Sequence, residues 1–201
     1  SIPAPVLHSS GAGRPILLLH PLGVDRSFWD GVVPDLDGFE VLTYDFPGHG
    51  QAPAPEQPYA IEDLADQARA LLAEAGHEQV DVVGVSLGGL VALRMAADDP
   101  GLVRRLVVVD AVTVYPQPMR DMWHDRAARA PVEGLEPFLE PTLALWFTAD
   151  AIDRGGPVVD GVRRAFLAGD PEGYALACRA LAGADLTGVV DRITAPALLV
   201  C

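Results

Sequence analysis

VDVVGVSLGGLVA, residues 80–92, is an apolar run with one serine, Ser86, near its centre. The first half, VDVVGV, is short and rich in β-branched residues, which predicts a buried strand, whereas the apolar residues after the serine recur at helical spacing. Ser86 therefore lies at a predicted corner between a strand and a helix. A sharp corner holds its central residue at positive φ and requires neighbours without side chains, and Gly84 and Gly88 meet that need.

The five residues from Gly84 to Gly88 form a G-x-S-x-G pattern, which is typical of a nucleophile elbow. Such an elbow lifts the serine hydroxyl out of the sheet and directs backbone N–H groups of the following helix toward it. A serine N-cap with incidental glycines gives the same letters, because serine is a favoured cap and the chain has 20 glycines. The order of the surrounding elements has to decide between these two interpretations.

Composition limits the class of protein. The chain has 201 residues, enough for one domain core, and its formal net charge of −14 argues against binding to nucleic acid or anionic membranes. Its two cysteines, Cys178 and Cys201, are too few for a disulfide framework, imply no metal site and fit a reducing cytoplasm. The first residues lack the pattern of a signal peptide, and no apolar stretch approaches the roughly 18 residues needed to span a bilayer. We expect a cytoplasmic protein.

Strand and helix patterns alternate along the first part of the chain. The pattern predicts strands at 15–20, 39–45, 80–85 and 103–112, and helices at 27–36, 61–76 and directly after Ser86. Apolar strands that alternate with helices predict a mostly parallel sheet covered by helices on both faces. Functional residues of such a sheet gather at the carboxyl ends of the strands, where His20, Asp45, Ser86 and Asp110 fall.

The pattern changes near Tyr115 to helical segments punctuated by prolines. We therefore divide the chain into a core at 1–113, an inserted helical cap at 114–190 and a return to the core at 191–201. The stretch ITAPALLVC at 193–201 has a strand pattern again. If the last strand and helix of the fold were absent, either the apolar strand at 197–201 would be an open edge of the sheet or one face of the sheet would lie uncovered.

Four motifs, in this order, resemble the α/β-hydrolase superfamily. They are HPLG at 20–23, DFPGHG at 45–50, GVSLGG at 84–89 and a cap inserted after the strand that ends at Asp110. Within the superfamily the chain is most similar to the 3-oxoadipate enol-lactonases, over essentially its whole length. This similarity is carried by HPLGVDRSFWD, WHDRAARA, LWFTAD, GDPEGYALACRALAGADL and RITAPALLV. Related esterases, perhydrolases and carbon–carbon bond hydrolases share most of the core motifs.

The resemblance implies cofactor-independent hydrolysis of a small ester or lactone through an acyl-enzyme on Ser86. It also implies that two backbone N–H groups hold the oxyanion. One belongs to Leu87, and the other to Leu22, because Pro21 has no N–H to donate. The remaining assignments are structural: His20 and Gly23 support the turn after the first long strand, and Gly84 and Gly88 support the elbow.

In the family an orienting acid and then a catalytic histidine follow the strand at 193–201. Neither position exists in these 201 residues, so the chain as given lacks the expected histidine. We expect the natural protein to continue past Cys201. Asp110 is an alternative candidate for the acid, although a polar residue that merely ends a strand is the more ordinary interpretation. His49 is expected to be structural, and His8, His77 and His124 are weaker candidates still.

The resemblance places substrate choice in the cap. A dicarboxylate-derived lactone keeps a carboxylate, which would need an arginine, and the candidates are Arg120, Arg126 and Arg129. Trp123, Arg126 and Trp146 form the expected substrate-binding set. Two features argue against an anionic substrate. The net charge of the protein is negative, and Leu145 occupies a position where relatives commonly have arginine. Two functions stay open: a serine hydrolase, with esterases and perhydrolases as near alternatives, and a catalytically silent scaffold that acts as a binding module.

Overall fold

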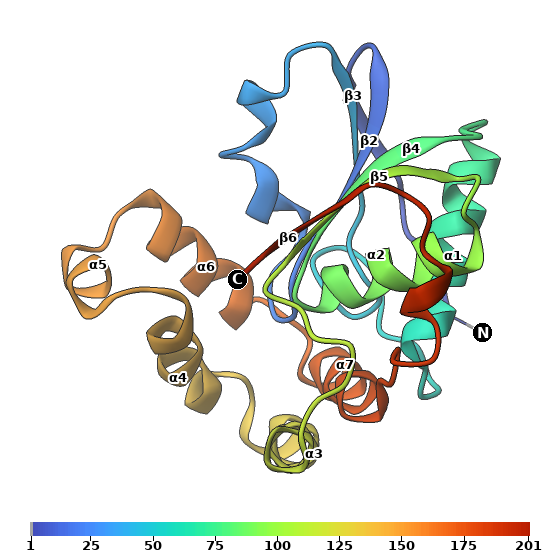
Figure 1. The fold of residues 1–201 in the computed structure, drawn as a ribbon. Coiled ribbons are helices and arrows are strands. Elements are labelled where there is room, and N and C mark those ends of the chain that lie inside the picture. The colour runs from blue at the N-terminus through green and yellow to red at the C-terminus, as the bar shows by residue number, and fades with distance from the viewer. Residues whose placement is uncertain (1) are drawn as a thin grey trace.

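A computed structural model describes residues 2–201 and contains a six-stranded sheet with helices around it (Figure 1). Its strands, in chain order, are β1 (His8–Gly11), β2 (Arg14–Leu19), β3 (Phe39–Thr43), β4 (Val80–Val85), β5 (Val103–Val109) and β6 (Ala197–Val200). In space they follow the order β1-β3-β2-β4-β5-β6. β1 runs antiparallel to β3, and the other neighbours pair in parallel. The parallel order therefore aligns the carboxyl ends of β2 to β6 at one edge of the sheet.

The two faces of the sheet are covered differently. Because successive side chains of a strand point to opposite faces, Leu17 and Leu19 of β2 join the large core under helices α1 (Ile61–Glu74) and α2 (Leu87–Asp98). Ile16 and Leu18 join a second, smaller cluster with Trp29 on the other face. A 3₁₀ helix, η1 (Arg26–Trp29), supplies that tryptophan.

The helix expected at 27–36 is instead two 3₁₀ turns, η1 and η2 (Val33–Asp35). Gly31 separates them, and glycine is a poor helix former. Pro34 follows within the second turn and has no N–H to donate to a continuing α-helix. This correction matters because the turns bring Phe28 and Trp29 onto the sheet.

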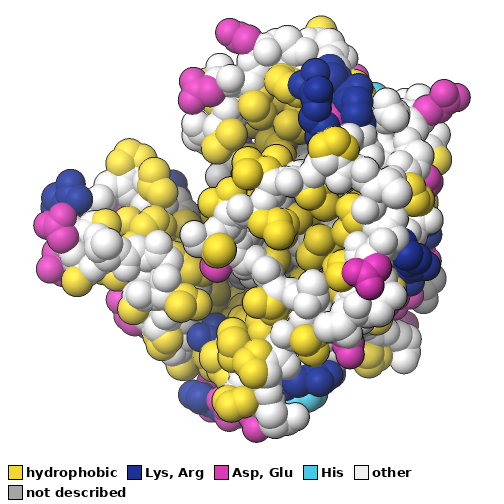
Figure 2. All heavy atoms as spheres, in the orientation of Figure 1, with side chains coloured by type: hydrophobic (Ala, Val, Ile, Leu, Met, Phe, Trp, Pro, Cys, Tyr) yellow, Lys and Arg dark blue, Asp and Glu magenta, His cyan; other side chains and the backbone are white. Residues whose placement is uncertain are grey.

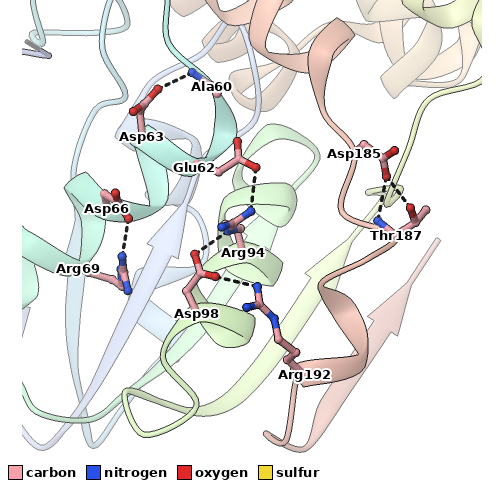
Figure 3. A network of polar contacts seen from close by, with 10 residues as sticks. All are labelled: Ala60, Glu62, Asp63, Asp66, Arg69, Arg94, Asp98, Asp185, Thr187 and Arg192. Atoms are coloured by element: carbon pink, nitrogen blue, oxygen red, sulfur yellow. Dashed lines mark hydrogen bonds and ion pairs between the residues drawn. The ribbon is translucent and has the colours of Figure 1, made fainter.

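Figure 3 shows polar contacts that connect the helices of the larger face. Arg94 of α2 pairs with Glu62 of α1 at 2.8 Å and with Asp98 of its own helix at 2.5 Å. Asp98 also accepts a hydrogen bond from Arg192 at 3.0 Å. Arg192 belongs to η3 (Val190–Arg192), which precedes β6. The network therefore fastens the last part of the described chain to the core helices.

Five helices lie between β5 and β6. They are α3 (Gln117–Glu133), α4 (Glu136–Trp146), α5 (Ala149–Arg154), α6 (Pro157–Leu167) and α7 (Pro171–Gly183). Helices α3 and α7 pack against each other, while α4, α5 and α6 extend to one side of the sheet (Figure 1). The segment is closed at its base, where Val114 bridges Asp185 and the Leu186 N–H donates to the Thr113 carbonyl at 2.8 Å. The proposed boundaries at 113/114 and 190/191 stay a prediction.

β6 lies at the edge of the sheet, parallel to β5. Its apolar side chains are largely exposed: Leu198 is 58% and Leu199 68% accessible. The strand predicted at 193–201 is thus shorter, four residues, and it is an edge strand of the sheet formed by residues 2–201. Within residues 2–201, none of the helices combines the length and the apolar character that a membrane crossing requires.

Candidate active site

The corner between β4 and α2 holds Ser86 in a strained conformation, with φ 51° and ψ −112°. In residues 2–201 only Ser86 and Asp110 have positive φ among the residues other than glycine. The Ser86 N–H donates to the Val109 carbonyl at 2.9 Å, and the Ser86 carbonyl accepts from the Leu90 N–H at 3.0 Å. Strained backbone of this kind persists where the surrounding structure enforces it. Ser86 is therefore held by both the neighbouring strand and the following helix.

The glycines on either side of Ser86 are fixed by backbone contacts. A Cβ added to Gly84 would lie 2.2 Å from the Gly88 carbonyl oxygen. A Cβ added to Gly88 would lie 2.3 Å from the Leu19 carbonyl oxygen. Because backbone atoms form both contacts, neither position can take a side chain without moving the strand or the helix. The small neighbours expected at the corner have a direct steric cause.

His20, in the turn after β2, is fully buried, and both of its ring nitrogens are engaged. Its Nδ1–H donates to the Pro21 carbonyl at 2.8 Å, and its Nε2 accepts from the Phe46 N–H at 2.9 Å. Burial, reinforced by the nearby His49 ring, lowers the pKa of His20 to about 3. This neutral, hydrogen-bonded ring fits the supporting role expected for His20 and has no nitrogen left for proton transfer.

The DFPGHG stretch forms a buried turn beside His20. Asp45 accepts from the Arg26 N–H at 2.8 Å and from the Gln51 N–H at 2.9 Å, so its carboxylate holds two loops together. His49 Nδ1–H donates to the Pro47 carbonyl at 3.1 Å, and burial lowers the pKa of His49. These partners are backbone groups, which is the pattern of a structural turn.

A pocket of about 750 Å³ opens above the carboxyl ends of the strands. Pro21, Ser86 and Asp110 line it on the sheet side, and residues of α4 and α6 line it on the opposite side. Figure 2 shows hydrophobic side chains gathered where the helical segment meets the sheet. The Ser86 hydroxyl therefore shares one largely apolar pocket with the helices of the segment.

Asp110 and Tyr115 are neighbours of Ser86. Asp110 follows β5 with φ 49°, and its N–H donates to the Val200 carbonyl at 2.7 Å. Burial raises the pKa of Tyr115 to about 12, while hydrogen bonding with the Ser86 hydroxyl opposes that rise and the Asp110 charge adds to it. The structure thus places a carboxylate and a phenol near the corner serine.

The structure puts the expected substrate-binding residues in different places. Trp146 lines the pocket and packs edge to face on Phe28, with ring centroids 6.3 Å apart. Trp123 does not line it, since this ring is buried against Tyr115 at 5.8 Å. Arg126 does not line it either; its Nη1 donates to the Tyr174 hydroxyl at 2.9 Å. Both corrections have one cause: α3 packs on α7, which turns their side chains into the segment rather than toward the pocket.

The other two candidate arginines are also engaged elsewhere. Arg120 donates to the Ala182 carbonyl at 2.8 Å, and Arg129 pairs with Asp125 and Glu133 on its own helix. The arginine that does line the pocket is Arg164 of α6, which the sequence analysis missed. Nothing in the sequence separates it from the adjacent Arg163, because only the packing of α6 decides which of the two meets the pocket.

The two leucines whose backbone N–H groups are expected to donate to an oxyanion lie at the start of a helix and in a turn. Leu87 is the first residue of α2, where N–H groups have no partner within the helix. Leu22 follows Pro21 in the turn after β2, and the side chains of both leucines are buried.

In residues 2–201 no group of three or more His, Cys, Asp or Glu side chains is arranged to hold a metal ion.

Comparison with known proteins identifies the fold. The alpha/beta hydrolase fold family matches residues 14–150. The chain belongs to this family. A solved structure, the enol-lactonase from Burkholderia xenovorans LB400, superimposes with a TM-score of 0.91 at 33% identity, covering 98% of this chain and 78% of that one. The sequence-based prediction of an α/β-hydrolase fold is confirmed.

Two curated proteins show the range of relatives. The chain is 30% identical over 191 residues to 3-oxoadipate enol-lactonase 2 of Acinetobacter baylyi, covering 94% of this chain and 71% of that protein. It is 32% identical over 200 residues to the pimeloyl-[acyl-carrier protein] methyl ester esterase of Neisseria meningitidis, covering 94% and 74%. The predicted resemblance to enol-lactonases is therefore confirmed, and the relatives support a hydrolase without naming one substrate.

Proposed function

We propose that this alpha/beta hydrolase opens a lactone or small carboxylic ester through an acyl-enzyme on Ser86. The observation that carries the proposal is the strained Ser86, at φ 51°, lining a pocket large enough for a small molecule. The names of the relatives, a lactonase and a methyl ester esterase, support an ester or lactone carbonyl as the reacting group.

The proposed reaction has two halves. The Ser86 Oγ attacks the carbonyl carbon, and the N–H groups of Leu22 and Leu87 stabilise the oxyanion of the tetrahedral intermediate. Collapse of that intermediate breaks the bond to the ester oxygen, releases the alcohol or opens the lactone, and leaves an ester on Ser86. Water then attacks this ester in the same way, releases the carboxylic acid and restores the hydroxyl.

The proton that leaves Ser86 needs an acceptor, which we do not assign to residues 2–201. None of the five histidines, all within that range, lines the pocket. Asp110 does line it and remains the alternative candidate for an orienting acid. The second candidate function is a binding scaffold that keeps the elbow without turnover.

Replacement of Ser86 separates the two candidates. We expect Ser86→Ala to lower the rate of 4-nitrophenyl acetate hydrolysis by about 10³-fold or more, because the nucleophile is removed. A fluorophosphonate probe should add to the wild-type protein at Ser86, as seen in its intact mass. Ser27→Ala is the matched control, since Ser27 lines the same pocket and should leave both results unchanged. Equal hydrolysis by wild type and Ser86→Ala would reject the hydrolase in favour of the scaffold.

A further inference from the structure

The turn that contains Leu22 is held from the core side by His20. The His20 Nδ1–H donates to the Pro21 carbonyl at 2.8 Å. That carbonyl and the Leu22 N–H belong to one peptide group, which is planar and trans, so the oxygen and the N–H point in opposite directions. The hydrogen bond from His20 therefore fixes one end of the peptide plane whose other end is the expected oxyanion donor.

The next residue of the turn, Gly23, is held from the side of the helical segment. Its φ is 81°, and a Cβ added to it would lie 2.7 Å from both Cδ2 and Cε2 of Phe166 and 3.4 Å from Cε2 of Tyr174. Apart from the chain neighbours of Gly23, these are the three heavy atoms nearest to such a Cβ. The rings of Phe166 and Tyr174 therefore lie directly against the backbone of the turn.

The ring of Phe166 is itself held in place. Phe166, near the end of α6, is 1% exposed and packs edge to face on Tyr174, with ring centroids 5.6 Å apart. Tyr174 belongs to the first turn of α7 and follows Gly173, whose Cα would lie 2.3 Å from a Cβ added to Gly48. Because this contact joins backbone to backbone, it anchors the start of α7 to the buried turn at Gly48. Tyr174, and through it Phe166, thus has a fixed position relative to the core.

Helix α6 also meets the pocket. Val162 and Ala165 line it, whereas Phe166 does not. The same turn of α6 therefore faces the pocket on one side and contacts the backbone at Gly23 on the other. Since the Phe166 ring is buried outside the pocket, it acts on the reaction only through the turn that it touches.

We propose that Phe166 is a positioning residue, which holds the Leu22 N–H ready for the oxyanion by packing on Gly23. The inference rests on the proposed hydrolysis at Ser86. A donor to an oxyanion must be placed accurately, because a displacement of about 1 Å in an active site can cost about 100-fold in rate. The oxyanion exists only in the transition state and the intermediate, so loosening this donor should lower kcat and leave KM nearly unchanged.

The alternative is that Phe166 only fills the interior of the helical segment. Replacing it would then lower stability, but the protein that remains folded would react as before. Phe138 of α4 provides the comparison, because it is also buried and stacks on the same Tyr174 ring, with centroids 6.1 Å apart. It does not line the pocket, and none of the three atoms nearest to a Cβ at Gly23 belongs to it.

The test compares 4-nitrophenyl butyrate with its thionoester, in which sulfur replaces the carbonyl oxygen. Sulfur is larger and accepts hydrogen bonds weakly, so the ratio of kcat/KM for the oxygen ester to that for the thionoester measures how well the oxyanion donors are placed. We expect Phe166→Leu to lower this ratio by about 10-fold and kcat for the oxygen ester by a similar factor, with KM changed by about twofold at most. Phe166→Ala should lower the ratio at least as much. A smaller folded fraction lowers both rates equally and leaves the ratio unchanged.

Phe138→Leu is the matched control, because it makes the same change on another aromatic neighbour of Tyr174. It should leave the ratio unchanged. A ratio that is unaffected in both Phe166 variants would overturn the inference, and so would an equal fall in Phe138→Leu. Failure of the proposed function appears separately, as butyrate hydrolysis that survives in Ser86→Ala. Rates are compared after subtraction of the spontaneous hydrolysis of each ester.

Discussion

The two walls of the pocket are held in different ways. The sheet-side wall is fixed by contacts between backbone atoms, in which a side chain at Gly84 or Gly88 would overlap a carbonyl oxygen. The helical wall presents side chains with space around them, such as Trp146 and Arg164. A wall fixed by backbone contacts suits a reacting group that must be placed accurately. In a wall formed by side chains, individual residues can be replaced to suit a different substrate. The comparison predicts that substitutions on the first wall affect folding, and those on the second affect substrate choice.

The largest expected effect comes from the same substitution made on both walls. Gly88→Ala in α2 places a Cβ 2.3 Å from the Leu19 carbonyl oxygen, and we expect a loss of about 3 kcal/mol or more in the free energy of unfolding. Apart from its chain neighbours and the backbone of its own helix, Gly161→Ala in α6 meets no heavy atom closer than 4.0 Å, and alanine is the better helix former, so stability should stay equal or rise by about 0.5 kcal/mol. Urea denaturation of both variants measures the difference.

Equal effects of the two substitutions would contradict the comparison. A large loss in Gly161→Ala would mean that the helical wall is as tightly packed as the sheet. A small loss in Gly88→Ala would mean that the strand and α2 can separate at little cost, in which case the strain at Ser86 would not be enforced by its surroundings.

The next largest expected effect is the pH dependence of stability, and it comes from a residue on the sheet side of the pocket. His20 has a pKa of about 3 in the folded protein, below the ordinary value of 6.5, because it is buried. The stabilising effect of this neutral ring is complete above pH 6.5. It is lost as the pH falls toward 3, because the unfolded chain binds a proton that the folded protein does not. As the pH falls through that range, a histidine that stays neutral in the folded protein lowers the free energy of unfolding by about 1.4 kcal/mol per pH unit.

Urea denaturation between pH 7.5 and 5 tests this assignment. We expect His20→Gln to be less stable than wild type at pH 7.5 but to lose stability less steeply below pH 6.5, because the titrating group is gone. His124→Gln, on the exposed side of α3, is the control for the same substitution at a histidine outside the buried turn. A slope that is unchanged in His20→Gln would show that other groups cause the acid sensitivity.

The difference between the walls also explains what the sequence could predict. The corner at Ser86 could be recognised from five consecutive residues, Gly84 to Gly88, although the contact that excludes a side chain at Gly88 comes from the distant Leu19 carbonyl. The alternating strands and helices were predictable for the same reason, since their periodicity is local. The prediction of one helix at 27–36 was wrong, because Gly31 and Pro34 interrupt the helix that the apolar pattern had indicated.

The helical wall could not be predicted in the same way. Arg126 is turned inward by its contact with Tyr174, which lies 48 residues further along the chain. Whether Arg163 or Arg164 meets the pocket depends on how α6 packs on α4, and both residues have the same sequence context. Trp146 lines the pocket and Trp123 does not, although both had been assigned from the same kind of evidence.

The smallest expected effect on stability tests the helical wall itself. Trp146 is half-buried and packs on Phe28 across the pocket, so Trp146→Ala should cost about 1 kcal/mol or less while raising KM for small esters by about 3- to 10-fold. Leu145→Ala is the control, because Leu145 lines the same pocket but is 76% exposed and should change neither quantity appreciably. If Trp146→Ala destabilised the fold as much as Gly88→Ala, the helical wall would be part of the folding core, and substrate preference could not vary there independently of stability.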